Sequence, residues 1–382
     1  LLFFFKYFNF LSKSLVSLLK SVSISMSPVT LNLVLPVGIS FYTFQTLGYV
    51  IDVYKGRTKA CRHFGKYAAF VSFFPLLLAG PIERAEHLMP QMEKEHSFDC
   101  DKAIWGAKLI AWGYFKKIAI ADVLSSSVDI VYNQVTNFTG LALGVATFFY
   151  AFQVYCDFSG YSDIARGVAC LFDIDLVNNF KSPYFAASIK EFWGRWHISL
   201  STWFRDYVYI PLGGNRVTTG RHIFNLLVVW FCTGLWHGAS WNFVVWGLYY
   251  GILLIFEKYV LKGKIEKLPL LGHLYTLFLV MVGWVFFFRP NLSAAGQYLA
   301  VMFGQGAAGA VDTAGLYYLT TGLVLFLLAV LFSTPLPFGL LRKLEENEWW
   351  DGLILAGYLA LFLLAVAYLI RDTYNPFLYF RF

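Results

Sequence analysis

The sequence predicts an all-α, multi-pass membrane protein, and its composition is the first reason. Of the 382 residues, 58% are hydrophobic and only 14% are charged. A soluble domain typically carries about 25% charged residues, which it needs to cover its surface. The second reason is the aromatic content of 20%, because Trp and Tyr gather where helices cross the two membrane interfaces. At about 20 residues per crossing, the apolar segments have room for about eight to ten spans.

The N-terminal part of the chain is expected to hold one full crossing and one shorter apolar segment. Residues 31–51 are apolar over a length that spans a bilayer. Residues 67–80 are apolar over too short a length for a crossing, which favours a re-entrant or interfacial segment. Because Leu1 already lies in an apolar run, we expect the chain to begin inside a helix. It is interpreted as one N-terminally truncated domain over 1–382.

The middle and C-terminal parts supply the other predicted helices. A helix over 103–121 carries three lysines and is expected to lie partly in the interface. Residues 222–256 contain no Asp, Glu, Lys or Arg and exceed one crossing, so a bend or hairpin is expected near Gly234 and Gly238. The other predicted spans are 141–156, the weaker 160–177, 272–288, 316–333 and 352–370.

The net charge of +7 is concentrated in short loops. The positive-inside bias places the most basic loop, which follows the first span, on the cytoplasmic side. The basic residues are not interleaved with a polar binding surface, so no nucleic acid is expected as a partner. The five cysteines lack metal-ligand spacing, and we expect free thiols and no metal site. The basic loop contains Lys55, Arg57, Lys59, Arg62 and Lys66.

His237 lies in the middle of the charge-free segment. An ionisable side chain at membrane depth is costly and usually faces a cavity or a pathway. Its neutral imidazole can accept a proton from a hydroxyl, which is the task of a general base in acyl transfer. The alternative is helix packing through Gly234 and Gly238, with His237 hydrogen-bonded to a neighbouring helix.

His197 lies in the aromatic segment 192–207, which is predicted as one amphipathic helix in the interface. His197 falls on its apolar face, and Ser201, one turn on, is placed to fix the tautomer of the ring. Periodicity alone leaves a packing histidine as open as a catalytic one. We expect Arg195 and Arg205 to meet an anionic cofactor near the cytoplasmic face, because guanidinium groups suit phosphates.

Other polar side chains lie in apolar surroundings between Gln153 and Asp163. They either line a hydrophilic path or cap a helix that starts near Ser159. The capping role is favoured for Ser159, and both roles stay open for Asp157.

Six motifs follow one another along the chain: LPVGISFYTFQ (35–45), AGPIER (79–84), YCDFSGYSD (155–163), NFKSPY (179–184), FWGRWHISLSTWFRD continuing to PLGGNR (192–216), and LWHGA (235–239). As a set they resemble the membrane-bound O-acyltransferase family, and its alginate O-acetyltransferase branch in particular. The resemblance runs from about Lys6 to the end of the chain.

The resemblance implies a fold of many helices and re-entrant segments around a membrane-embedded tunnel. It also implies two signature histidines, which map onto His197 and His237, with His237 as the catalytic one. We therefore assign both histidines to catalysis. Asp173 stands where the branch usually has Gly, which predicts a disturbed turn. The residues assigned to substrate binding are Arg195, Ser201, Arg205, Asp206, Trp236 and Asp157.

The function implied is transfer of an acetyl group toward hydroxyls of an exported polysaccharide. The donor is expected to be acetyl-CoA or another acyl thioester, used as a substrate rather than a bound cofactor. Expected partners are a periplasmic or membrane-tethered acetyltransferase of the serine-hydrolase type and the polysaccharide synthase and export machinery, in the bacterial inner membrane. Two alternatives remain. One is a D-alanyl transfer protein of teichoic acid synthesis, and the other is a transporter or scaffold whose polar residues line a permeation path.

Overall fold

The computed structural model describes residues 2–305 and 313–371, which form helices joined by turns and loops. These ranges contain no β-strand, so the predicted all-α class is confirmed. Five of the described helices are long and apolar enough to cross a membrane. They are α8 (Gly140–Leu171), α12 (Trp241–Phe256, extended to Leu261 by η6), α13 (Pro269–Phe288), α15 (Thr313–Phe332) and α17 (Asp351–Arg371).

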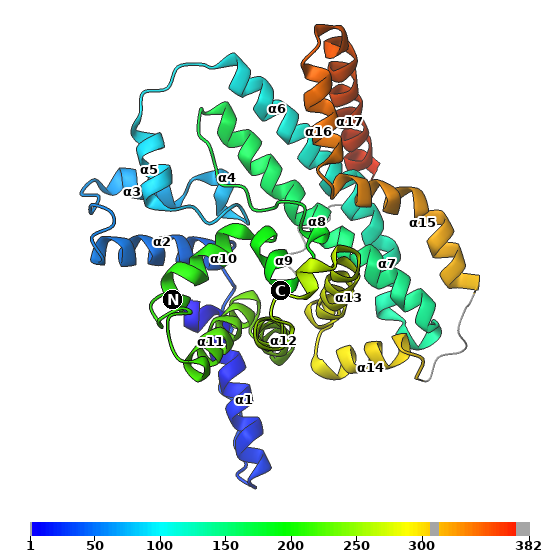
Figure 1. The fold of residues 1–382 in the computed structure, drawn as a ribbon. Coiled ribbons are helices and arrows are strands. Elements are labelled where there is room, and N and C mark those ends of the chain that lie inside the picture. Colours follow the sequence, from blue (N-terminus) through cyan, green and yellow to red (C-terminus); the bar gives the residue numbers. More distant parts are fainter. Residues whose placement is uncertain (1, 306–312, 372–382) are drawn as a thin grey trace.

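Helix α8 lies at the centre of this bundle and α15 and α17 lie at its edge (Figure 1). In α8, 78% of the apolar stretch is buried inside the protein, whereas in α17 only 11% is buried. The predicted spans at 272–288, 316–333 and 352–370 are confirmed as α13, α15 and α17. Within the described residues, the number of long apolar helices is below the eight to ten expected, because much of the apolar sequence there forms shorter helices around α8.

The prediction of two segments at 141–156 and 160–177 was wrong. Helix α8 continues through this region for 32 residues, so Ser159 lies in mid-helix and does not cap one. The reason is that its polar groups are satisfied by lysines on the neighbouring η2 (Phe115–Asp122). Lys116 Nζ lies 3.0 Å from Ser159 Oγ, and Lys117 Nζ lies 2.6 Å from Asp157. Paired in this way, polar side chains need not interrupt an apolar helix.

Helix α6 (Cys100–Tyr114) packs directly on α8 through glycines. A Cβ on Gly160 would lie 2.8 Å from the carbonyl oxygen of Gly113, which is closer than side-chain carbons approach. After η2 the chain continues as α7 (Val123–Asn133). Residues 103–121 therefore belong to a longer helical element that packs against the central helix.

The first predicted span begins later than expected. Helix α2 covers Ile39–Tyr54, and residues 22–38 contain no helix. Gly38 ends the irregular stretch with φ = 74°, and a Cβ there would overlap the carbonyl of Leu77. Helix α1 (Phe8–Ser21) precedes this stretch and projects away from the body of the protein (Figure 1).

The short apolar segment at 67–80 forms no crossing helix, as predicted. It contains parts of two short helices, α3 (Phe64–Val71) and α4 (Phe74–Leu77). Helix α5 (Ala85–Glu93) follows and packs against α3. These helices lie beside α2 at one side of the molecule (Figure 1).

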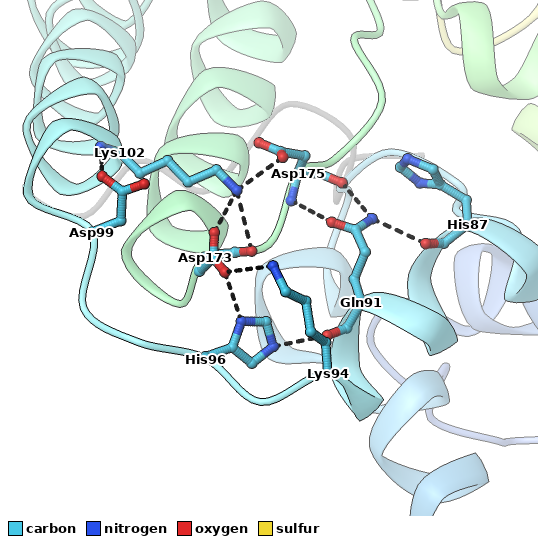
Figure 2. Close-up of polar contacts among 8 residues, drawn as sticks. All are labelled: His87, Gln91, Lys94, His96, Asp99, Lys102, Asp173 and Asp175. Atoms are coloured by element: carbon cyan, nitrogen blue, oxygen red, sulfur yellow. Dashed lines mark hydrogen bonds and ion pairs between the residues drawn. The ribbon is translucent and has the colours of Figure 1, made fainter.

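The turn after α8 is not disturbed by Asp173 but is anchored by it. Asp173 has φ = 58°, a left-handed conformation that Asp tolerates better than most residues with a Cβ. Its carboxylate accepts hydrogen bonds from Lys102 Nζ at 2.6 Å and His96 Nδ1 at 2.9 Å, and Lys94 lies at 3.8 Å (Figure 2). The hydrogen bonds from Lys102 and His96 lower the pKa of Asp173 from its usual 3.8 to about 2. The aspartate thus joins the end of α8 to the start of α6.

The charge-free segment 222–256 forms the predicted hairpin. Helix α11 (Thr219–His237) ends at Gly238, and α12 returns alongside it. A Cβ on Gly234 would overlap the carbonyl of Phe243, so the glycine lets the two backbones touch. The remaining helices of the C-terminal half are α14 (Leu292–Met302) and α16 (Leu336–Glu345).

The aromatic segment 192–207 is not one helix. It is divided into α9 (Ile189–Arg195) and α10 (Ile198–Phe204), with η5 (Arg205–Tyr209) after them. The break lies at Trp196 and His197, where His197 adopts φ = 44°. A left-handed residue cannot continue a right-handed helix, so the face assignment made from a single helical wheel does not hold across the break.

Candidate active site

His237 is the last residue of α11 and lies in an aromatic cage. Its ring centroid is 4.8 Å from that of Trp246, 5.0 Å from that of Trp236 and 5.2 Å from that of Phe287. The side chain is 5% exposed. The hairpin fixes this arrangement, because Gly238 breaks α11 directly after the histidine and α12 brings Trp246 back against it.

The end of α11 is held by two residues from the start of the chain. Lys6 Nζ lies 2.6 Å from the carbonyl oxygen of Trp236 and 3.3 Å from that of His237. The Tyr7 hydroxyl donates to the carbonyl of Leu235 at 3.0 Å. These contacts satisfy carbonyls that the helix end leaves without a partner. Sequence reasoning missed Lys6, although a lone lysine in an apolar run was a signal that pointed to it.

His197 lies at the sharp turn between α9 and α10 and is 1% exposed. Its ring centroid is 4.7 Å from that of Phe158 and 5.9 Å from that of Trp236. The indole of Trp236 therefore lies between the surroundings of His197 and those of His237. The structure brings these three predicted site residues into one buried cluster.

The role expected for Ser201 was wrong. Its hydroxyl lies 3.5 Å from the carbonyl oxygen of Trp196 and does not contact the imidazole. Among the described residues, neither ring nitrogen of His197 has a hydrogen-bond partner. Because the helix breaks at His197, the i, i+4 relation that would have placed Ser201 against the ring does not exist.

The charged residues assigned to substrate binding are engaged with other charges. Arg195 pairs with Glu191 one turn earlier in α9. Arg205 Nε lies 2.8 Å from Asp206, which also pairs with Arg84 at 3.3 Å. These contacts give both arginines a carboxylate partner within the protein.

Asp157 is likewise committed to the fold. Its carboxylate lies 2.6 Å from Lys117 Nζ, which also lies 2.6 Å from Asp122. Asp157 lies within α8, so it does not cap a helix, and its assignment to substrate binding stays a prediction. Its partners lie 40 residues earlier in the chain, which is why periodicity could not reveal the pair.

An aromatic column runs along α11 and α12 from His237 toward the opposite end of the hairpin. The ring of Trp193 is 4.8 Å from that of Trp230 and 4.9 Å from that of Tyr250, and Tyr250 is 5.3 Å from Trp246. Within the described residues, Nε1 of Trp193, Nε1 of Trp246 and the Tyr250 hydroxyl have no hydrogen-bond partner. Buried donors without partners are uncommon in a packed core.

Two clefts lie at opposite ends of the α11–α12 hairpin. The first has a volume of about 640 Å³ and lies near the start of α11, where His222 contributes to its wall. The second has a volume of about 730 Å³ and lies beyond the end of α11, where Ser240 contributes. At 1.5 Å per residue, the 15 residues from His222 to His237 span about 22 Å. The histidine at the end of α11 thus lies close to the second cleft and far from the first.

The sequence profile of the membrane-bound O-acyltransferase family matches residues 62–293. The chain is 37% identical to a probable alginate O-acetylase of Pseudomonas putida, over 99% of this chain and 81% of that protein. It is 37% identical to a peptidoglycan O-acetyltransferase of Helicobacter pylori, over 72% of this chain and 58% of that protein. A teichoic acid D-alanyltransferase of Streptococcus thermophilus is 31% identical, over 59% of this chain and 58% of that protein.

The chain therefore belongs to the membrane-bound O-acyltransferase family. The family and the names of these relatives support the enzyme class predicted from the sequence, an O-acyltransferase. The apolar helices agree with a membrane protein.

Proposed function

We propose that the protein takes an acetyl group from a cytoplasmic thioester and passes it across the membrane to hydroxyls of an exported polysaccharide, directly or through a partner enzyme. One observation carries this proposal. His197 and His237 flank the same buried indole, in a hairpin that has a cleft at each of its ends. A transferase that works on two sides of a membrane needs such a site.

In the proposed reaction, His237 accepts the proton of the acceptor hydroxyl while its oxygen attacks the thioester carbonyl. The tetrahedral intermediate then collapses, the carbon–sulfur bond breaks and the thiolate leaves with the proton from His237. The products are an ester and a free thiol. A positioned general base of this kind contributes about 100- to 10,000-fold to the rate. The two unpaired ring nitrogens of His197 are assigned to positioning the donor or the acceptor.

The first cleft is the proposed donor side. Lys190, Lys258 and Lys262 line it, and within the described residues none of them pairs with a carboxylate. Glu257, which lines the same cleft, is occupied by the backbone amides of Ile189 at 2.6 Å and Lys190 at 3.0 Å. This cleft suits the phosphates of a donor such as acetyl-CoA better than the ion-paired Arg195 and Arg205.

The aromatic column is the proposed route of the donor from the first cleft to His237. Its unpaired indole and phenol groups would donate hydrogen bonds to amide carbonyls of a narrow, thioester-bearing arm. The donor is thus a substrate that passes along the column and leaves as a thiol.

The second cleft is the proposed acceptor side, because it is lined by the residues directly after His237. The expected partners there are a serine-hydrolase-type acetyltransferase and the synthase and export machinery of the polysaccharide. In this proposal the protein lies in the bacterial inner membrane, with the basic loop at 55–66 in the cytoplasm.

Cysteine labelling of closed vesicles tests the sidedness, in a background with Cys61 and Cys100 replaced by Ser. Thr58→Cys and Gly194→Cys should react with an impermeant maleimide only from the cytoplasmic side, because Thr58 lies in the basic loop and Gly194 lies in α9, whose Lys190 lines the proposed donor cleft. Ser293→Cys, on the exposed wall of the second cleft, is the matched control and should react only from the periplasmic side. Periplasmic labelling of both Thr58→Cys and Gly194→Cys would reverse the donor side and contradict the proposal.

The donor itself is tested with reconstituted protein and two labelled thioesters, acetyl-CoA and a D-alanyl thioester on a carrier protein. The proposal expects acetyl transfer to a hydroxyl acceptor and no D-alanyl transfer. The opposite preference would favour the function named for the Streptococcus relative.

A further inference from the structure

Asn179 lies beside the turn that carries His197, and its side chain is completely buried. It belongs to the irregular segment between α8 and α9, and no role has been assigned to it above. Its position matters because the turn at His197 has an unfavourable backbone. A residue with a Cβ at φ = 44° is strained unless its surroundings hold it there.

The surroundings that hold this turn are largely supplied by Asn179. Its backbone carbonyl accepts from the amide of Ile198 at 3.1 Å, and its side-chain Oδ1 accepts from the amide of Ser199 at 3.0 Å. These are the first two amides of α10, which have no partner inside the helix. A single residue thus caps both amides that follow the strained histidine.

Two further hydrogen bonds hold the chain on either side of the turn. The amide of Lys181 donates to the carbonyl of Arg195 at 2.9 Å, so the Asn179 segment also holds the chain before His197. The amide of Ile82 donates to Ser199 Oγ at 3.0 Å, which ties α10 to the segment before α5. His197 is therefore fixed on both sides through its backbone, while its ring nitrogens make no hydrogen bond among the described residues.

We propose that Asn179 is a positioning residue, which holds His197 in its left-handed conformation and thereby aims the imidazole into the active site. The ring needs this support because it has no hydrogen bond of its own to orient it. The side-chain amide nitrogen of Asn179 has no partner among the described residues, so the side chain acts through the hydrogen bond that Oδ1 accepts. This inference rests on the proposed acyl transfer only for its kinetic part.

The kinetic experiment compares Asn179→Ala with Asn178→Ala in acetyl transfer from acetyl-CoA by reconstituted protein. Asn178 is the matched control, because its Oδ1 also accepts a backbone amide, that of Phe180 at 3.1 Å, but does not touch the His197 turn. Misplacing a reacting group by about 1 Å can cost about 100-fold. For Asn179→Ala we expect kcat to fall by roughly tenfold to 100-fold, with KM little changed. Asn178→Ala should stay close to the parent. Equal kcat values for the two variants would overturn the proposal.

A second measurement does not depend on activity. Glycine accepts a positive φ without strain, so His197→Gly removes the need for support. Asn179→Ala should therefore lower the thermal midpoint less in the His197→Gly background than in the parent, and should remain foldable there even if it does not fold alone. An equal loss in both backgrounds would contradict a role that acts through His197. If the parent transfers no acyl group, the proposed function fails while this comparison still decides the role of Asn179.

Discussion

The polar clasp around Asp173 and the buried cluster around His197 use similar side chains in opposite ways. In the clasp, both ring nitrogens of His96 are occupied, by Asp173 at 2.9 Å and by the Gln91 carbonyl at 2.7 Å (Figure 2). In the cluster, His197 has no hydrogen-bond partner among the described residues, although it is far more buried.

The difference distinguishes polar side chains that stabilise the fold from those proposed to act on a substrate. Buried polar groups normally find partners, because an unsatisfied one costs free energy. The saturated clasp therefore stabilises the fold and offers nothing to a ligand. The two ring nitrogens of His197 make no hydrogen bond among the described residues, and its turn is held by backbone contacts such as those of Asn179.

In the buried cluster around His197, we expect the largest loss of rate from substitution of His237 and the second largest from substitution of His197. Replacing His197 with Ala should lower the rate of acyl transfer by about 100-fold or more, because a positioned proton-transfer or orienting group is lost. His63→Ala, in the exposed loop before α3, is the control and should leave the rate unchanged. A His197→Ala variant with parental kcat would show that the unsatisfied ring has no part in the reaction.

A smaller effect is expected at Lys6, which holds the end of α11 but does not belong to the cage around His237. Lys6→Met keeps most of the side-chain volume and removes the hydrogen bonds to Trp236 and His237. We expect kcat to fall by about tenfold, since a loss of about 1.4 kcal/mol is a factor of ten. Lys20→Met, at the exposed end of α1, should behave as the parent. A normal rate for Lys6→Met would mean that the hairpin alone fixes His237.

The smallest effect on activity is expected in the clasp, where Asp173→Asn should change acid stability instead. The pKa of Asp173 is lowered from 3.8 to about 2 in the folded state. The carboxylate therefore stabilises the fold at pH values above its unfolded-state pKa, and this stabilisation is lost as the pH falls toward 2. The variant should therefore have a lower thermal midpoint than the parent near neutral pH. The two midpoints should converge in acid.

The control for the clasp is Asp101→Asn, at an exposed position in the first turn of α6. It should lower the midpoint less than Asp173→Asn does near neutral pH. A strong loss of transfer activity in folded Asp173→Asn would break the distinction between the two regions.

The features that the sequence predicts best are those carried by local composition. The charge-free run at 222–256 predicts the hairpin and places His237 at a break, because a helix of that length exceeds one crossing. The cytoplasmic side of the basic loop at 55–66 is also predicted from charge, and it stays a prediction. The aromatic content correctly predicts a membrane protein built from helices.

The features that the sequence does not predict depend on contacts between distant segments. The left-handed turn at His197 is held by Asn179, so the helical periodicity of 192–207 gives no sign of the break. Lys6 reaches carbonyls 230 residues away. Asp157 is paired with Lys117 on η2, and Asp173 is paired with Lys102 on α6, far from them in the sequence.

The central claim is that His237 is the base in acyl transfer, and His237→Ala tests it most directly. The parent and the variant are reconstituted in vesicles with labelled acetyl-CoA on the cytoplasmic side and a hydroxyl acceptor on the other. We expect no ester in the variant, while its expression, membrane insertion and thermal midpoint stay close to those of the parent. Transfer at the parental rate would contradict the claim, and loss of the folded protein would instead assign His237 to packing.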